Sequence, residues 1–228
     1  MRVGIICEGP SDAAVITNIL KATLEIDRSD IQYLVPELDY DETDLTQMPK
    51  ERFSTWSIVK QSCEDRQKIN NFLELIDDDR FIVIHLDSDT RNEKGFDVFE
   101  PKNIACDEDI ELLCTNITSK IYEWLGQIAS PKFVLAIAVA AIDAWVLSIY
   151  DSKPKDTGLL NNPKVKLFQL INRNLSIKDK NKIFALEKDK FEQYHLLSTD
   201  FRKLKNLKKH LEHNISLKLF CEALLSRN

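Results

Sequence analysis

The sequence predicts an α/β protein, with a parallel sheet flanked by helices in its first part and an α-helical C-terminal extension. Two observations support this fold class. Short apolar runs, each about as long as a buried strand, alternate with segments of helical periodicity up to residue 150. Such alternation is typical of parallel strands joined by right-handed crossover helices. Beyond residue 163 the apolar spacing is helical throughout. We therefore expect two parts, residues 1–150 and residues 164–228.

The composition is that of a globular protein. With 228 residues, of which 43% are hydrophobic, the chain can bury a substantial core. It has no apolar run of the roughly 18 residues that a membrane span requires, and residues 3–7 are too short for the core of a signal peptide. The five cysteines are odd in number and lack Cys-x-x-Cys spacing, which disfavours a disulfide framework or a zinc ribbon. These features predict a cytoplasmic protein without a membrane partner.

The net charge of −6 is unevenly distributed. Residues 1–163 carry 16 Lys/Arg and 30 Asp/Glu, a balance of −14, whereas residues 164–228 carry 15 and 7, a balance of +8. An acidic body with a basic appendage fits a metal held by one part and a polyanion, such as nucleic acid, held by the other. It fits equally a basic segment that docks on the acidic body of its own chain. Composition alone leaves both interpretations open.

The first strand leads directly into a turn and a helix. Residues 2–7 form a short apolar run that ends at a Gly-Pro turn. Ser11 or Asp12 can cap a helix, and residues 13–24 carry apolar side chains at helical spacing. The unit is therefore strand, tight turn and helix, with the carboxylate of Glu8 at the tip of the strand.

The next elements lead to a strongly apolar strand near the middle of the chain. A second strand is expected over residues 31–35, followed by an acidic, irregular excursion over residues 37–51. Residues 57–76 have the periodicity of one long helix. Residues 80–86 then form a strongly apolar strand, as expected for burial on both faces. His85 within this strand is expected to pack in the sheet rather than to act in catalysis.

This strand ends in two carboxylates one residue apart, Asp87 and Asp89. In parallel sheets ligands bind outside the carboxyl ends of the strands, where these side chains would lie. Two like charges this close repel each other, and a divalent cation is the usual reason for both to stay ionised. Carboxylate oxygens on a short loop suit Mg²⁺ or Mn²⁺ better than zinc. A strand that ends in an ordinary polar turn is the alternative interpretation.

The remaining elements of the first part bring another carboxylate to the same edge. Residues 91–102 form a polar connection, residues 107–128 a helix and residues 133–139 a fully apolar strand. A helix starts at the tip of this strand, with Asp143 in its first turn. Asp143 also fits a simpler role as a favourable charge at a helix N-terminus. Three strand tips would then carry acids at one edge of the sheet: Glu8, Asp87 with Asp89, and Asp143.

The second part is predicted to be helical. Residues 151–163, which contain two prolines and a glycine, are expected to form a linker. Four helices follow, over about residues 164–173, 178–196, 199–212 and 215–227. The third of them carries a basic cluster, formed by Lys203, Lys205, Lys208 and Lys209. A solvated basic face is the usual explanation of such a cluster, and contact with phosphate groups is the alternative.

Two of these motifs together resemble a known family. A strand ending in Glu8-Gly9-Pro10-Ser11-Asp12, followed by a later strand ending in Asp87-Ser88-Asp89, is similar to the TOPRIM domain of topoisomerases, primases and OLD-type nucleases. The resemblance covers roughly residues 1–150 and implies a TOPRIM-like, Rossmann-like parallel sheet. The junction at residues 138–147 is similar to small stand-alone TOPRIM proteins related to the OLD group, several of which belong to phage-defence or toxin-like systems.

The resemblance implies roles for the acidic residues. Asp87 and Asp89 would bind Mg²⁺ or Mn²⁺, and Glu8 would be a further ligand or a general acid or base. Asp12 would hold a second metal, with Asp143 as a support for that site. Phosphodiester hydrolysis needs such a metal to neutralise developing charge and to generate or orient the nucleophile.

Basic residues and partners are less closely defined. A basic residue usually assists at the scissile phosphate, and the candidates are Arg91, Lys190 and Arg202. The lysine cluster of residues 203–209 is a candidate surface for nucleic acid. The chain contains no P-loop motif, so a sensor ATPase would be a separate partner protein. A homo-oligomer is a further candidate assembly.

The sequence therefore predicts a Mg²⁺-dependent TOPRIM nuclease that hydrolyses phosphodiester bonds in RNA, such as tRNA, or in DNA, as a phage-defence or toxin-like effector. One alternative is a non-catalytic TOPRIM protein that binds nucleic acid or a partner. Another is a phosphatase of the haloacid-dehalogenase type, which also has Asp-x-Asp after an apolar strand and uses the first Asp as nucleophile. That family expects Thr or Val two residues after the second Asp, where this chain has Arg91.

Overall fold

The computed structural model describes residues 1–38, 55–75, 79–127, 129–151 and 156–227. From residue 39 onward, the excursion expected over residues 37–51 lies outside these ranges. Among the helices within them, none is long and apolar enough to cross a membrane.

Parallel strands form the centre of the described fold. They are β1 (Arg2–Ile6), β2 (Ile31–Val35), β3 (Arg80–Asp87) and β4 (Phe133–Ala138), in a four-stranded sheet of order β2-β1-β3-β4. β3 pairs with β1 on one side and with β4 on the other, which explains its apolar composition, because a central strand of a parallel sheet is buried on both faces. The predicted α/β fold with a parallel sheet is confirmed.

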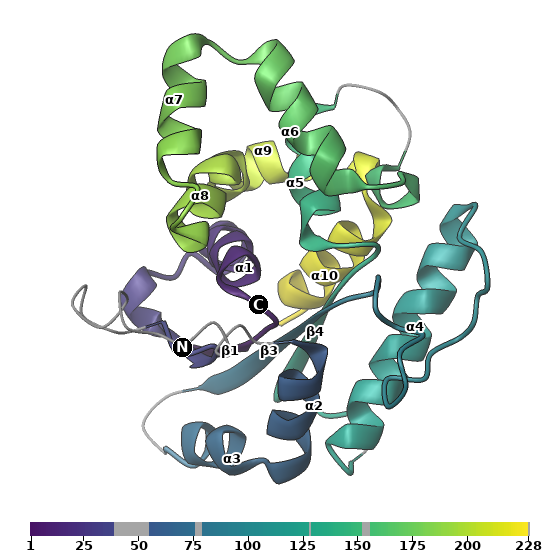
Figure 1. Ribbon diagram of the computed structural model, residues 1–228. Coiled ribbons are helices and arrows are strands. Elements are labelled where there is room, and N and C mark those ends of the chain that lie inside the picture. The colour runs from purple at the N-terminus through teal and green to yellow at the C-terminus, as the bar shows by residue number, and fades with distance from the viewer. Residues whose placement is uncertain (39–54, 76–78, 128, 152–155, 228) are drawn as a thin grey trace.

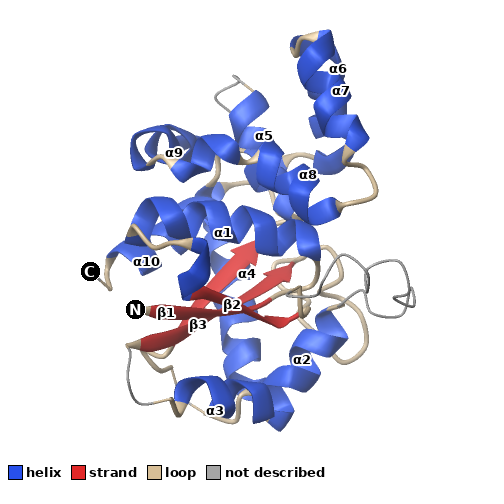
Figure 2. Ribbon diagram, turned by 90° about the vertical axis from the view of Figure 1, so that its left-hand side faces the viewer, coloured by secondary structure: helices blue, strands red, loops and turns tan. Residues whose placement is uncertain are grey.

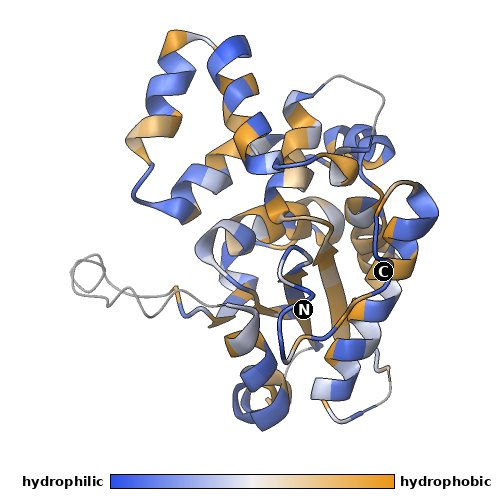
Figure 3. Cartoon of the chain, turned by 45° about the vertical axis from the view of Figure 1, so that its right-hand side comes forward, coloured by the Kyte–Doolittle hydropathy of each residue, from blue (hydrophilic) through white to orange (hydrophobic). Residues whose placement is uncertain are grey.

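Helices cover both faces of this sheet (Figures 1 and 2). The first face packs against α1 (Pro10–Leu24), α5 (Ile142–Tyr150) and α10 (Ile215–Leu225). The second face packs against α2 (Trp56–Asp65), α3 (Gln67–Leu73) and α4 (Asp107–Trp124). In Figure 3 the strands are coloured as hydrophobic, whereas the helices alternate between hydrophobic and hydrophilic residues. Each face of the sheet therefore has its own hydrophobic cluster.

The side chains of β3 alternate between these two clusters. Phe81 and Val83 belong to the cluster under α1, whereas Ile82, Ile84 and Leu86 belong to the cluster under α2 and α4. This is the period of two that a β-strand imposes on its side chains. Any residue at an odd-numbered position of β3 therefore points toward α1, α5 and α10.

The helix expected over residues 57–76 is instead two helices, α2 and α3. Arg66 separates them because it adopts the left-handed conformation, with φ 56°. The side chain of Asp65 accepts a hydrogen bond from the backbone N–H of Gln67 (3.0 Å), and the Arg66 guanidinium donates to the carbonyl oxygen of Leu125 (3.1 Å). These local contacts hold the break, which an apolar periodicity alone does not reveal. The helix expected over residues 107–128 also ends early, at Trp124.

The C-terminal region is helical, as expected, but two of the four predicted helices are interrupted. They are α6 (Pro163–Asn174), α7 (Ile177–Ala185), α8 (Lys190–Leu197), α9 (Leu204–His210) and α10. Asp189 divides the helix expected over residues 178–196, because its side chain caps α8 by accepting from the N–H of Glu192 (3.0 Å). The helix expected over residues 199–212 consists of α9 between two 3-10 turns.

Of these helices α10 lies on the first face of the sheet, against β4, whereas α8 and α9 pack on α1 and α6 packs on α5 (Figure 2). α8 and the 3-10 turn after it pack along α1 (Figure 1). The side-chain amide of Asn18 on α1 donates to the carbonyl oxygen of His195 (2.9 Å) and to the hydroxyl of Ser198 (2.7 Å). Apolar residues of α6, α8, α9 and α10 belong to the same hydrophobic cluster as α1. The C-terminal region and α1 therefore share one core.

The segment expected as a linker, residues 151–163, is packed where it is described. Thr157 opens a 3-10 turn and its hydroxyl donates to the carbonyl oxygen of Ala144 on α5 (2.7 Å). The carboxylate of Asp156 accepts from the backbone N–H of Ile215, the first residue of α10 (2.7 Å). The described part of this segment is therefore fixed to α5 and α10 rather than free.

Candidate metal centre

Three strands deliver acidic residues to the carboxyl edge of the sheet. Glu8 follows β1, Asp87 is the last residue of β3, and Asp143 lies in the first turn of α5, after β4. The backbone N–H of Asp87 donates to Oε1 of Glu8 over 2.8 Å. Asp12, in the first turn of α1, is buried close to Asp87, with His85 between them. The parallel sheet thus brings together carboxylates that are far apart in the sequence.

The tip of β3 is fixed to the start of α5. Oδ1 of Asp87 accepts a hydrogen bond from the N–H of Ile142, the first residue of α5 (2.9 Å). The hydroxyl of Ser88 accepts from the N–H of Ala140 (2.9 Å), and the N–H of Ser88 donates to the carbonyl oxygen of Ala138 (3.0 Å). A carboxylate is favourable at a helix N-terminus. The position of Asp87 is therefore set by the chain on both sides of it.

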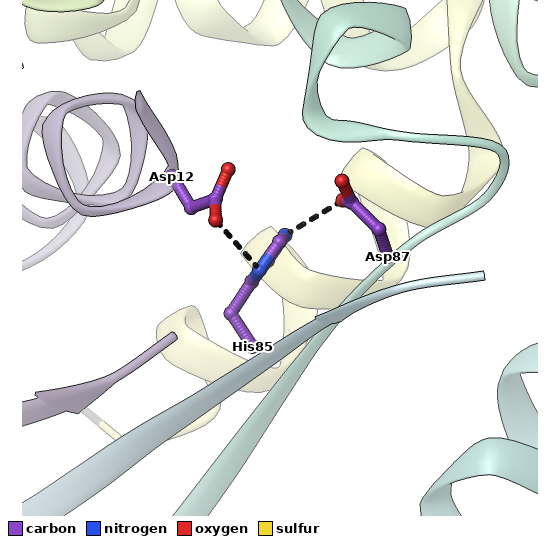
Figure 4. Close-up of side chains that lie close together, drawn as sticks. All are labelled: Asp12, His85 and Asp87. Atoms are coloured by element: carbon purple, nitrogen blue, oxygen red, sulfur yellow. Dashed lines mark ion pairs between the residues drawn. The ribbon is translucent and has the colours of Figure 1, made fainter. Parts of the chain in front are cut away.

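His85 lies between Asp12 and Asp87, and each of its ring nitrogens faces a different carboxylate (Figure 4). The distance from Nδ1 to Oδ2 of Asp12 is 3.9 Å, and the distance from Nε2 to Oδ1 of Asp87 is 3.6 Å. His85 is fully buried and packs against Trp145, so it is part of the sheet core as expected. Its position beside two carboxylates was not predicted.

The group formed by Asp12, His85 and Asp87 can hold a metal ion. One ligand atom from each residue lies within 4.8 Å of the others. Neither ring nitrogen of His85 has a hydrogen-bond partner, although both are buried. Burial lowers the pKa of His85 to about 3, so the imidazole is neutral at pH 7, as a metal ligand must be. The donor set of this group therefore fits a divalent cation.

Burial and mutual repulsion raise the pKa of the carboxylic groups. Burial is the first cause in each case, and neighbouring acids add to it. The pKa of Glu8 rises to about 7, with Asp89 as its main charged neighbour, and that of Asp12 rises to about 8, with Glu8 as its main charged neighbour. The pKa of Asp87 lies well above its usual range, owing to burial and to Asp12, Glu8, Asp89 and Asp143. A divalent cation would favour the ionised form of all of them.

Asp89 and Asp143 complete the group but differ in their surroundings. Asp89 is partly exposed, and its pKa is raised by burial and by the nearby charges of Glu93 and Asp143. Asp143 is buried and accepts a hydrogen bond of 2.5 Å from the hydroxyl of Tyr194 on α8. Burial raises the pKa of Asp143, and the bond from Tyr194 opposes that rise. The C-terminal region therefore contributes a side chain to the candidate site.

Sequence reasoning missed both His85 and Tyr194 as members of this group. His85 precedes Asp87 by two residues, and the period of two places both side chains on one face of β3, which is a signal that was available. Tyr194 lies 51 residues from Asp143, and nothing in its local sequence connects the two. Only the packing of α8 against α1 reveals it.

The three basic candidates for the scissile phosphate lie in different surroundings. Arg91 is buried, and its guanidinium donates to the carbonyl oxygen of Pro101 (2.7 Å). Arg202 donates to the side chain of Asn18 on α1 (2.7 Å) and contacts His195. Lys190 is half-buried, and its charge lowers the pKa of Asp143, as does that of Lys164. Among the predicted candidates, Lys190 is thus the one that interacts with the acidic group.

The lysines of the basic cluster lie on the surface. One precedes α9 and three belong to it, and all four are solvent-exposed: Lys203, Lys205, Lys208 and Lys209. Their side chains are free to contact a polyanion from solvent.

Comparison with models of protein families, with curated proteins and with solved structures finds no match for this chain. The molecule has an α/β fold and a buried group of Asp12, His85 and Asp87 with the donor atoms for a metal ion.

Proposed function

We propose that this chain is a metal-dependent nuclease of the TOPRIM type, which hydrolyses phosphodiester bonds in nucleic acid. The observation that carries the proposal is the gathering of carboxylates from the ends of β1 and β3 and the starts of α1 and α5 at one edge of a parallel sheet: Glu8, Asp12, Asp87, Asp89 and Asp143. The motifs around Glu8 and Asp87 resemble those of TOPRIM domains, and the four-stranded parallel sheet is compatible with that fold. Repulsion among these groups is what a bound cation relieves.

In this proposal Asp87 and Asp89 hold Mg²⁺ or Mn²⁺, and Asp12 and Asp143 support binding on the inner side of the group. When bound, the cation neutralises charge that develops on the phosphate and lowers the pKa of water. Tyr194 keeps Asp143 oriented by donating to its Oδ1. Asp87 is held by the N–H of Ile142, so its carboxylate is presented in one orientation.

Glu8 is the residue that we assign to proton transfer. Without a metal its pKa is about 7, and a bound cation would favour its ionised form, in which the carboxylate can accept a proton as a general base must. Its Oε1 is occupied by the backbone N–H of Asp87, which fixes the orientation of the side chain. The proposal therefore gives Glu8 a role distinct from that of the metal-binding aspartates.

The basic C-terminal region is the proposed contact for the nucleic-acid backbone. Residues 164–228 carry a net charge of +8, and the lysines around α9 are exposed. Such charges bind phosphates without sequence preference and keep the polymer near an acidic catalytic group that would otherwise repel it. A phage-defence or toxin-like role, with a separate sensor ATPase as partner, remains part of the proposal.

The proposal is tested by incubating the chain with labelled tRNA, single-stranded RNA, and single- and double-stranded DNA, in Mg²⁺ or Mn²⁺. Wild type is expected to cut at least one polymer. Glu8→Gln and the double variant Asp87→Asn/Asp89→Asn are each expected to lose about 10²-fold or more in rate, because they remove proton transfer and metal binding respectively. Glu111→Gln, an exposed carboxylate on α4, is the matched control and should cut normally.

Cleavage that both site variants retain would point to a contaminating nuclease and would refute the proposal. If wild type binds one polymer but cuts none in either metal, the chain is a non-catalytic binding protein rather than a nuclease.

A further inference from the structure

The two ring nitrogens of His85 lie in the core without a hydrogen-bond partner among the described residues. His85 is fully buried, and neither Nδ1 nor Nε2 has a hydrogen-bond partner. A buried polar atom without a partner destabilises the folded state, so a histidine is unfavourable at this position of β3 unless something binds it. The preceding positions of the strand on the same face, Phe81 and Val83, are apolar, so the sheet itself does not require a polar side chain before its last residue.

The distances around His85 are those of ligands rather than of hydrogen bonds. The contacts of 3.6 Å to Asp87 and 3.9 Å to Asp12 exceed the usual length of a hydrogen bond. Two ligand atoms that share one ion, each about 2.1 Å from it, lie at most about 4.2 Å apart. The two contacts use different ring nitrogens, so an ion bound to Nε2 would share the Asp87 pair and an ion bound to Nδ1 the Asp12 pair; each pair falls inside that limit, and both carboxylates face the ring (Figure 4).

The surroundings fix the imidazole ring in this position. Trp145 meets it edge to face, with ring centroids 5.9 Å apart and an interplanar angle of 84°. Trp145 is held in turn by a hydrogen bond from its indole N–H to the hydroxyl of Ser216 (2.8 Å) and by stacking on Phe220. A ligand whose orientation is locked by neighbouring packing binds a metal without first losing rotational freedom.

We propose that Asp12, His85 and Asp87 form a mixed nitrogen and oxygen metal centre, in which His85 is a direct ligand and which prefers Mn²⁺ and other first-row transition ions over Mg²⁺. This inference rests on the proposed function and deepens it, because it adds Asp12 and His85 to Asp87 as direct ligands at that site and assigns the metal preference. Imidazole suits transition ions, whereas Mg²⁺ prefers oxygen ligands and retains water. His85 binds the ion through one ring nitrogen. The other nitrogen faces the second carboxylate and can donate its proton to one oxygen of that group, the usual support of a metal-bound histidine, while the other oxygen is available to the ion.

The experiment uses the full chain, treated with a chelator and then titrated with Mn²⁺ or Mg²⁺. Electron paramagnetic resonance of the free Mn²⁺ gives its affinity, and competition gives that of Mg²⁺. Electron spin echo envelope modulation then detects the nitrogen nucleus of an imidazole bound to Mn²⁺. Wild type is expected to bind Mn²⁺ at least about tenfold more tightly than Mg²⁺ and to show the nitrogen modulation.

His85→Gln is expected to lose the nitrogen modulation and at least about tenfold in Mn²⁺ affinity, with a smaller change for Mg²⁺. His213→Gln is the matched control, on the 3-10 turn before α10, and should keep both signals. Asp12→Asn is a second variant, and it should weaken Mn²⁺ binding while the nitrogen modulation remains. Circular dichroism of each variant establishes that it is folded.

Absence of nitrogen modulation in Mn²⁺-loaded wild type would overturn the inference without any variant, as would equal affinity for Mn²⁺ and Mg²⁺. These readouts do not involve cleavage. A chain that shows the nitrogen signal but cuts no polymer keeps this inference and loses the proposed nuclease, whereas one that cuts without the signal does the reverse.

Discussion

On the α2, α3 and α4 face of the sheet, β3 buries Ile82, Ile84 and Leu86 among apolar side chains, whereas on the α1, α5 and α10 face the same strand ends in His85 and Asp87. The residues alternate along one strand and share its hydrogen bonding. Their environments nevertheless differ, because α1 and α5 bring Asp12 and Asp143 to one face, while α2 and α4 bring mainly apolar residues to the other.

The difference separates stability from function within a single sheet. Apolar burial on the second face contributes favourable free energy of folding at every position. Buried, mutually repelling carboxylates cost free energy of folding in the absence of a ligand, and so does an imidazole without hydrogen-bond partners. The polar face therefore lowers the stability of the ligand-free protein, whereas the apolar face raises it. Variants of each face and changes of pH measure the two contributions.

The largest effect is expected from Ile84→Ala on the apolar face. Ile84 is fully buried, so truncating it should lower the free energy of unfolding by about 2–5 kcal/mol, measured by urea denaturation in the presence of chelator. The adjacent His85→Leu should instead raise that free energy by about 1–3 kcal/mol, because it removes two polar atoms without partners.

The two substitutions should have the opposite order of effects on the affinity for Mn²⁺. Folded Ile84→Ala is expected to bind Mn²⁺ as wild type does, whereas His85→Leu should bind it weakly. If His85→Leu proved less stable than wild type without metal, His85 would have a structural role on its face and the contrast between the two faces would fail.

An intermediate effect is expected from pH on the chelator-treated protein. The folded pKa values of Glu8 and Asp12, about 7 and about 8, lie above the usual values of about 4 for unfolded Glu and Asp. Between these limits the folded state binds more protons than the unfolded state, so stability falls as pH rises from about 5 to about 8. Each group that holds its proton only in the folded state contributes a slope of about 1.4 kcal/mol per pH unit.

Urea denaturation at several pH values checks this slope, with Glu8→Gln/Asp12→Asn as the control in which it should flatten. Saturating Mn²⁺ should flatten it too, because the cation takes the place of the protons. A stability that instead increased steadily up to pH 8 would mean that these carboxylates are not crowded in solution.

The sheet and the acidic edge could be predicted from the sequence because each depends on local rules. The apolar runs gave the strands, and the carboxyl ends of parallel strands necessarily meet, so the closeness of Glu8 and Asp87 follows from their positions after β1 and β3. The break at Arg66 and the cap at Asp189 were not predicted, because a change of helix direction leaves the apolar spacing of the flanking residues intact.

The interior of the candidate site depends on tertiary packing and was therefore not predictable in the same way. The face on which His85 lies follows from strand periodicity, but its closeness to Asp12 depends on how α1 packs over β3. The contact of Tyr194 with Asp143 depends on the placement of α8, which belongs to the C-terminal region. Neither contact has a spacing signature.

The smallest effect is expected from Tyr194→Phe, which tests whether the C-terminal region belongs energetically to the polar face. Loss of the hydroxyl leaves the buried Asp143 without this donor, so stability should fall by about 1–3 kcal/mol at pH 8. The bond favours the ionised carboxylate, and the pKa of Asp143 is already raised by burial. The variant should therefore raise that pKa further, and the loss should shrink at pH 5, where Asp143 binds a proton more readily.

Tyr150→Phe is the matched control for this pH dependence. The hydroxyl of Tyr150 donates to the carbonyl oxygen of Leu197 (2.9 Å), an acceptor that does not titrate. Urea denaturation of both variants at pH 5 and pH 8 should therefore show a pH-dependent loss for Tyr194→Phe and a constant loss for Tyr150→Phe. Equal losses at both pH values for Tyr194→Phe would mean that its hydroxyl contributes packing alone. The polar face would then consist of residues on the sheet, α1 and α5, with no contribution from the C-terminal helices.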